Sequence, residues 1–216
     1  ALWPMPAHAQ TIRMPVSPCQ AIARSLPGVT FASFKPSSAF HVQAAADEKV
    51  TITYVGHSTF LIETPGGISI ATDYSGWYAP PKVPDVVTMN KAHSSHYTLT
   101  PDPAIQHVLH GWGDDGQPAD HDVVVGDTYI RNVTTDIRSG GATMEPDGNS
   151  IFIFEVAGLC IGHLGHLHHE LDDTDYAGIG RLDVLMVPVD GGLTMGAESM
   201  SRVVTRLRSS LILPMH

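Results

Sequence analysis

The sequence predicts an α/β sandwich, in which two sheets pack together and helices lie on the outside. Three observations lead to this prediction. Short β-rich runs joined by tight turns begin at Lys49. A helical segment with one apolar face occupies residues 197–209, and a final β-rich run follows it directly. Hairpins combined with a helix that leads into a strand are typical of this fold class.

The strands are predicted from short runs of β-branched and apolar residues with turn-forming residues at their ends. They cover residues 50–55, 59–63, 68–72, 86–89, 123–125, 128–133, 151–156, 159–162, 184–188 and 211–214. Residues 65–67 and Gly158 form the turns of two hairpins. A weak helical pattern covers residues 18–26, and the segment 197–209 is amphipathic.

The composition is that of one acidic domain. With 216 residues, the chain can bury roughly 70% of its unfolded surface, so its core needs no structural metal. Any metal ion is therefore expected to be functional. The 12 Lys and Arg residues against 22 Asp and Glu residues argue against nucleic acid or an anionic membrane as the main partner. No apolar run reaches the ~18 residues of a membrane span.

The first residues are similar to the end of a secretory signal, with Ala7 and Ala9 before a cleavage point at Gln10. We therefore expect residues 1–9 to be a residual signal tail, 10–48 an N-terminal extension and 49–216 the folded domain. The expected location is periplasmic or secreted. Cys19 and Cys160 are predicted to be structural, and the sequence does not decide whether they pair.

Histidines gather after the ends of the predicted strands. The chain has 13 of them. Those at strand ends are His57, His93, His96, His163, His166, His168, His169 and His216. Imidazole is a common metal ligand, and a metal site needs three or four donors that converge from separate loops. The alternative is a solvated histidine-rich loop over residues 164–171 that binds metal only adventitiously.

A set of short motifs follows in a fixed order along the chain. They are residues 56–63, Thr72-Asp73, residues 85–97, residues 148–150 with 163–169, residues 187–192 and residues 213–216. From Lys49 to the end, this order resembles the metallo-β-lactamase superfamily. The resemblance points to the branch of ascorbate-6-phosphate lactonase-like and N-acylphosphatidylethanolamine phospholipase D-like metal-dependent hydrolases. It implies a four-layer αββα sandwich, with a metal site at one edge between the sheets.

The metal-binding motif departs from the family pattern. Where the family has His-x-His-x-Asp-His, the matching residues are Lys91, His93, Ser95 and His96. Thr135 stands near the next family histidine, His166 replaces the bridging aspartate after Gly165, and His216 matches the final ligand. The resemblance therefore implies that the first metal position keeps only His93, while the second keeps or gains three imidazoles.

Neutral imidazoles without bridging carboxylates favour one ion over two. We expect one zinc ion, bound by His96, His166 and His216, with His93 as a fourth ligand or a neighbour. Manganese, iron and copper stay open as alternatives. Lys91 is expected to orient a substrate carboxylate or phosphate, and His169 is the candidate general acid.

His57 and Asp73 are expected to support the site structurally, and Asp190 is a candidate carboxylate partner of a ligand.

The sequence thus predicts a metal-dependent hydrolase that attacks a small-molecule substrate with a metal-bound hydroxide. The substrate is a lactone, ester, phosphodiester or amide. One alternative is a non-catalytic metal- or ligand-binding protein on a decayed hydrolase scaffold. Another is a redox role with iron or copper in the histidine site. The sequence does not decide the oligomeric state.

Overall fold

The first of two sheets contains five strands. The computed structural model describes residues 17–21, 49–114, 116–139 and 143–216. The strands β1 (Thr51–Gly56), β2 (Thr59–Glu63), β3 (Ser69–Ala71), β4 (Val86–Met89) and β5 (His107–His110) lie side by side in that order. Antiparallel pairing joins β1 to β2 and β2 to β3, and parallel pairing continues from β3 to β5.

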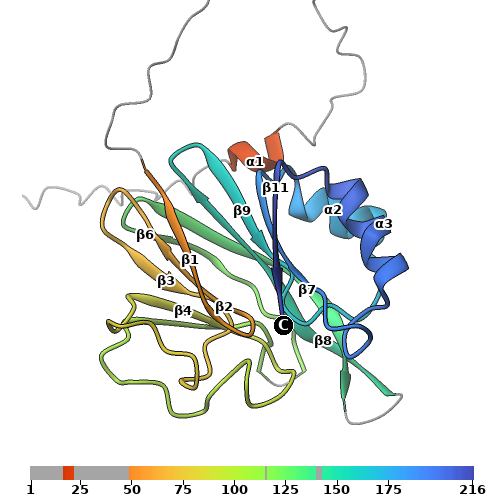
Figure 1. The fold of residues 1–216 in the computed structure, drawn as a ribbon, viewed down its shortest axis with the longest axis horizontal. Helices are drawn as coiled ribbons and strands as arrows, with labels where there is room; N and C mark the ends of the chain where they lie inside the picture. The colour runs from red at the N-terminus through yellow and green to blue at the C-terminus, as the bar shows by residue number, and fades with distance from the viewer. Residues whose placement is uncertain (1–16, 22–48, 115, 140–142) are drawn as a thin grey trace, which may run out of the picture.

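The second sheet contains six strands. They are β11 (Leu211–Met215), β10 (Val184–Pro188), β9 (Leu159–His163), β8 (Thr143–Val156), β7 (Thr128–Ser139) and β6 (Asp122–Val125), in that spatial order. The strands from β6 to β9 are antiparallel, whereas β9, β10 and β11 run parallel. The parallel strands end at one edge of the sandwich, where the C-terminus also lies (Figure 1).

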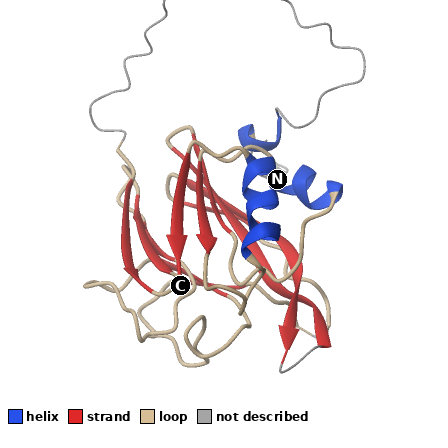
Figure 2. Cartoon of the chain, turned by 45° about the vertical axis from the view of Figure 1, so that its right-hand side comes forward, coloured by secondary structure: helices blue, strands red, loops and turns tan. Residues whose placement is uncertain are grey.

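The apolar core lies between the two sheets. Phe60, Ile62 and Ile70 of the first sheet belong to one buried cluster with Phe152 and Phe154 of the second. Burying each such side chain contributes about 1.5–3 kcal/mol. A second cluster fills the outer face of the six-stranded sheet, where α1 (Pro18–Ala21), α2 (Asp173–Ile179) and α3 (Ala197–Leu207) pack (Figures 1 and 2).

The two-sheet α/β sandwich is confirmed, but the expected four-layer αββα arrangement needs a correction. In the described residues, helices cover the outer face of one sheet only, so there are three layers (Figure 2). On the outer face of the five-stranded sheet, loop residues Tyr97, Ile105 and Trp112 pack on Val87 and Met89. Loops therefore cover the apolar residues that a layer of helices would otherwise cover.

The predicted strands all occur, with small shifts at their ends. The strand β5 and the helix α2 were not predicted, and β7 and β8 are longer than predicted. Of the helix expected over residues 18–26, Pro18–Ala21 is helical. The remainder of that helix, the proposed signal tail 1–9 and most of the extension 10–48 lie outside the described residues.

Residues 17–21 are fastened to the second sheet. A disulfide joins Cys19 to Cys160 on β9. The Ser17 hydroxyl donates to the buried carboxylate of Glu155, which also pairs with the guanidinium of Arg131. In the part of the chain that the structure describes, no helix combines the length and apolar character needed to cross a membrane.

Candidate metal centre

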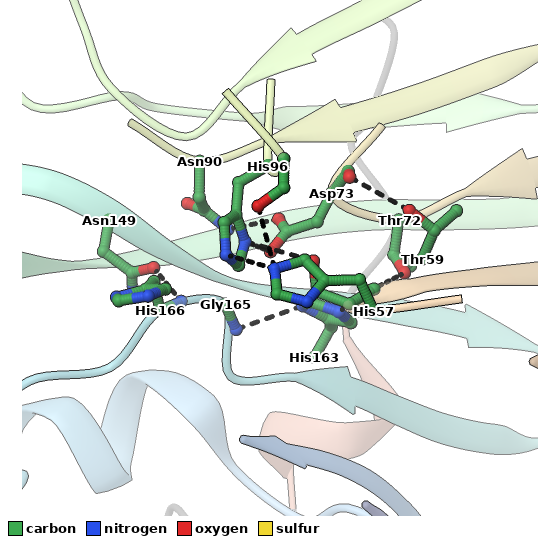
Figure 3. A network of polar contacts seen from close by, with 12 residues as sticks. His57, Thr59, Thr72, Asp73, Asn90, His96, Asn149, His163, Gly165 and His166 are labelled. Carbon is green, nitrogen blue, oxygen red and sulfur yellow. Dashed lines mark hydrogen bonds and ion pairs between the residues drawn. The ribbon is translucent and has the colours of Figure 1, made fainter. Parts of the chain in front are cut away.

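Five histidines from both sheets meet at one edge of the sandwich, and Figure 3 shows three of them, His57, His96 and His166. The five are His57, His93, His96, His166 and His216. The first three follow β1 and β4 in the five-stranded sheet, and the last two follow β9 and β11 in the six-stranded sheet. Because each side chain leaves the end of a strand, the sheets fix the positions of the loops that carry them.

Two residues of this cluster, and Asp73 beside it, have unusual backbone conformations. The φ angles are 53° at His57, 43° at Asp73 and 84° at His216. A positive φ in a residue other than glycine costs about 1–3 kcal/mol and is often found at functional sites. The fold therefore holds these side chains in place against a local preference of the backbone.

His96 lies at the centre of the cluster and is fully buried. Its ring centroid is 4.5–4.9 Å from those of His57, His93, His166 and His216. Its Nε2 is 3.3 Å from Nε2 of His57. Two ligands of a tetrahedral zinc ion with bonds of about 2.05 Å are about 3.3 Å apart. These two nitrogens are therefore at ligand-to-ligand spacing.

The described residues contain three trios whose donor atoms all lie within 4.8 Å of one another. They are His57 with His96 and His216, His93 with His96 and His166, and His166 with Asp190 and His216. The predicted ligand set His96, His166 and His216 is not itself one of these trios. However, each of the three predicted ligands belongs to two of the trios. The predicted ligands are therefore the residues that neighbouring trios share.

The same three imidazoles are held through their outer nitrogens. Nδ1 of His96 is 2.7 Å from a carboxylate oxygen of Asp73, and Nδ1 of His216 is 3.1 Å from one of Asp190. Nδ1 of His166 is 2.7 Å from Nε2 of His168. Metal-ligating histidines are commonly oriented by such a contact to the second ring nitrogen.

The inner nitrogens are available for a metal ion. Nε2 of His166 and Nε2 of His216 are buried and have no hydrogen-bond partner among the described residues. A buried polar atom without a partner is costly unless something binds it. The donor set is therefore suited to a metal ion that prefers imidazole, such as zinc.

Burial keeps these imidazoles in the form that binds metal. It lowers the pKa of His166 to about 2 and the pKa of His216 to about 4. Burial and then the charge of Arg138 lower the pKa of His168 to about 4. Burial alone would raise the pKa of Asp73, but His163 and the hydrogen bonds from His96 and Asn90 lower it to about 2. Near neutral pH, the imidazoles of His166, His168 and His216 are neutral and Asp73 is ionised.

The metal-free protein should lose stability as the pH falls from about 6.5 toward 4. In the unfolded chain, His166, His168 and His216 take up protons near pH 6.5, whereas the folded chain resists protonation down to about pH 4 or below. The unfolded state therefore binds more protons in this range. The free energy of unfolding decreases as the pH decreases.

Urea unfolding of metal-free protein at about pH 7 and about pH 4.5 measures this effect. The midpoint should be lower at the acidic pH, and the variant His216→Gln, which lacks one titrating group, should show a smaller difference. Equal midpoints at both pH values for the wild type would contradict the prediction.

The turn that carries His166 depends on a glycine. Gly165 has a φ of 61°, and a Cβ atom there would collide with the side chains of Asn149 and Asn90. The backbone N–H of His166 donates to Oδ1 of Asn149 at 2.7 Å (Figure 3). This close packing fixes the direction in which the His166 side chain leaves the chain.

Comparison with known proteins shows the family. The model of the beta-lactamase superfamily domain matches residues 51–216, which include both sheets and all five histidines of the cluster. The chain belongs to the metallo-β-lactamase superfamily. This confirms the resemblance at the level of the superfamily.

Individual relatives agree with this membership. A UPF0173 metal-dependent hydrolase of Anaeromyxobacter dehalogenans is 26% identical, over 80% of this chain and 76% of its own. A candidate Zn-dependent hydrolase of the same superfamily from Thermotoga maritima is 30% identical, with a TM-score of 0.56, over 78% of this chain and 76% of its own. A diiron β-hydroxylase from Streptomyces venezuelae shares the fold at 12% identity, with a TM-score of 0.50, over 78% of this chain and 45% of its own.

The positions where this member of the metallo-β-lactamase superfamily departs from the motif have other contacts. The ammonium group of the half-exposed Lys91 pairs with the carboxylate of Glu145, which competes with the substrate contact expected for Lys91. The Thr135 hydroxyl accepts a hydrogen bond from Asn149. The Ser95 hydroxyl lies 2.8 Å from His57 Nε2 and 2.6 Å from His93 Nδ1.

The structure does not bring His169 into the cluster. Its Nε2 accepts from the backbone N–H of Asp136, and its Nδ1 donates to the carbonyl oxygen of Glu170. Both ring nitrogens are therefore engaged by backbone groups and are not directed at the cluster. His168, one residue earlier, faces the pocket beside His166 instead.

The structure places two further residues at the centre, His57 in a candidate ligand trio and Arg138 in the lining of the pocket. His57 was expected to be structural, although the strand-end rule that found the other histidines applies to it equally. Arg138 was not considered, because it lies in a polar part of β7 that was not predicted as strand.

Proposed function

We propose that this protein is a metal-dependent hydrolase with one zinc ion held by His96, His166 and His216, and with His93 as a fourth ligand or a neighbour. The observation that carries the proposal is the arrangement of these three imidazoles. Each has Nδ1 engaged by another side chain, and two have a buried Nε2 without a partner. We also propose that the protein belongs to the branch of ascorbate-6-phosphate lactonase-like and N-acylphosphatidylethanolamine phospholipase D-like hydrolases, which the sequence motifs indicate.

A bound zinc ion supplies positive charge that lowers the pKa of a coordinated water and polarises the bond to be cleaved. The chain's own residues prepare the site for this chemistry. Asp73 orients His96, and Asp190 orients His216. Beside the cluster, a pocket of about 320 Å³ is lined by His93, His166 and His168. Its size suits a small substrate, such as a lactone, ester, phosphodiester or amide.

One ion is favoured over two by the charges around the centre. Two cations about 3.5–4 Å apart need bridging anions to offset their repulsion. The position of the bridging aspartate is taken by the neutral His166. The carboxylate of Asp190 already accepts hydrogen bonds from Gly192 and Thr194, which hold it beside His216.

The disulfide supports a periplasmic or secreted location. Such bonds persist in oxidising compartments and are rare in the cytosol of most organisms. Cys19 and Cys160 are both buried where they join, which is typical of a structural bond.

A second candidate function is a metal-binding protein without catalysis. The replacement of family ligand positions by Lys91, Ser95 and Thr135 favours it. In that case His93 would complete a set of four ligands and leave no open position for water.

The test is hydrolysis by the metal-free protein reloaded with one equivalent of zinc, iron or manganese. A lactone, a 4-nitrophenyl ester, a phosphodiester and an anilide cover the substrate classes. We expect zinc-dependent cleavage of at least one, which a chelator removes and added zinc restores. Stoichiometric zinc without cleavage of any of them would favour the non-catalytic function.

A further inference from the structure

The pocket beside the histidine cluster has a cation at its wall. Arg138 lines the pocket together with His93, His166 and His168. The exposed Leu193 also lines it. Among the residues that line this pocket, Arg138 is the one whose side chain carries a permanent charge, so its guanidinium is the charged group that the lining offers to a ligand.

The long hairpin of β7 and β8 carries Arg138 to this place. Arg138 pairs with Met144, and the register shifts between Thr135 and Ile137, where β8 contains extra residues. Such irregularities bend a hairpin and change the direction of its side chains. The hairpin projects at the end of the molecule where the C-terminus lies (Figures 1 and 2). Ile137 is buried in the fold, whereas Arg138 is exposed.

Arg138 differs from most other cations of the described chain. Arg131, Arg181, Arg202, Arg206 and Lys91 each pair with a carboxylate. Among the described residues, no hydrogen bond or ion pair engages the Arg138 guanidinium. An unpaired guanidinium at a pocket wall offers a planar set of donors that matches a carboxylate or a phosphate.

The net charge of the whole chain makes Arg138 more important for attracting an anion. The formal net charge is -10, so the surface as a whole repels anions. Lys91, the other cation expected at the centre, is neutralised by Glu145. In the metal-free protein, attraction of an anion to this pocket therefore depends on Arg138.

We propose that Arg138 is a specificity-determining residue that binds an oxyanion group of the substrate, a carboxylate or a phosphate, away from the bond that is cleaved. The claim that Arg138 determines substrate specificity rests on the proposed function. The claim that Arg138 binds an anion does not, because this contact needs neither a metal ion nor turnover.

The first experiment measures anion binding by calorimetry at low salt. Metal-free protein is titrated separately with inorganic phosphate and with succinate, which distinguishes a phosphate from a carboxylate preference. We expect at least one to bind, and Arg138→Gln to weaken that binding about tenfold or more. Arg138→Lys should lose less, and Lys82→Gln, which removes an exposed cation at another surface, should bind as the wild type does.

The second experiment uses zinc-loaded protein and two 4-nitrophenyl esters, the neutral acetate and the anionic hydrogen succinate. In Arg138→Gln, kcat/KM should fall for the succinate ester and stay unchanged for the acetate. Absence of anion binding by the wild type, or equal binding by wild type and Arg138→Gln, would overturn the proposal. Anion binding that depends on Arg138 without hydrolysis of either ester would support it and count against the hydrolase.

Discussion

Replacing His166 by alanine should abolish stoichiometric zinc binding and any zinc-dependent hydrolysis. His166 belongs to two of the three candidate ligand trios, and its Nε2 is buried without a partner. Removing one of three ligands leaves two imidazoles, which do not make a closed zinc site. Elemental analysis of purified protein should therefore give close to one zinc per wild-type chain and close to none per variant chain.

The control is His107→Gln, because His107 lies on β5 and belongs to none of the candidate trios. It should keep one zinc per chain. Circular dichroism should show that His166→Ala retains its sheets, since the core between them is apolar and does not include His166. Two zinc ions per wild-type chain, or full zinc content in the variant, would show that the ligand assignment is wrong.

Reduction of the Cys19–Cys160 disulfide should lower the free energy of unfolding by about 2–5 kcal/mol. The two cysteines are 141 residues apart, so the bond restricts a large part of the unfolded chain. Bonds that close long loops have the largest stabilising effect in the chain-entropy model. Urea unfolding with and without dithiothreitol measures the change.

The double variant Cys19→Ala with Cys160→Ala should unfold like the reduced wild type, and dithiothreitol should not affect it further. Its zinc content should equal that of the wild type, because no sulfur atom belongs to the candidate ligand trios. The same unfolding midpoint for oxidised and reduced wild type would refute a stabilising role.

Much of the fold could be predicted because its strands are runs of apolar residues. The buried strands β8, β9 and β10 show this pattern clearly. The short strand β5 begins and ends with histidine, and α2 contains a glycine, so neither has a strong local signal. β5 forms through pairing with β4, and α2 begins with a capping box at Asp172 and Asp175.

The site was predictable to the extent that strand ends determine it. His93, His96, His166 and His216 come together as the order of motifs predicts. The side chains of Lys91 and His169 go elsewhere because of partners distant in sequence. Glu145 is 54 residues from Lys91, and Asp136 is 33 residues from His169. No local pattern in the sequence indicates such partners.

The histidine cluster draws on both sheets of the sandwich. His57, His93 and His96 come from the five-stranded sheet, and His166 and His216 come from the six-stranded sheet. An ion bound between them would link the two sheets at this edge, in addition to the apolar core and to hydrogen bonds such as those between Asn90 and Ser150. Loading and removal of metal should therefore change how often that edge opens, and amide hydrogens of the β1–β2 turn should exchange more slowly in the loaded state.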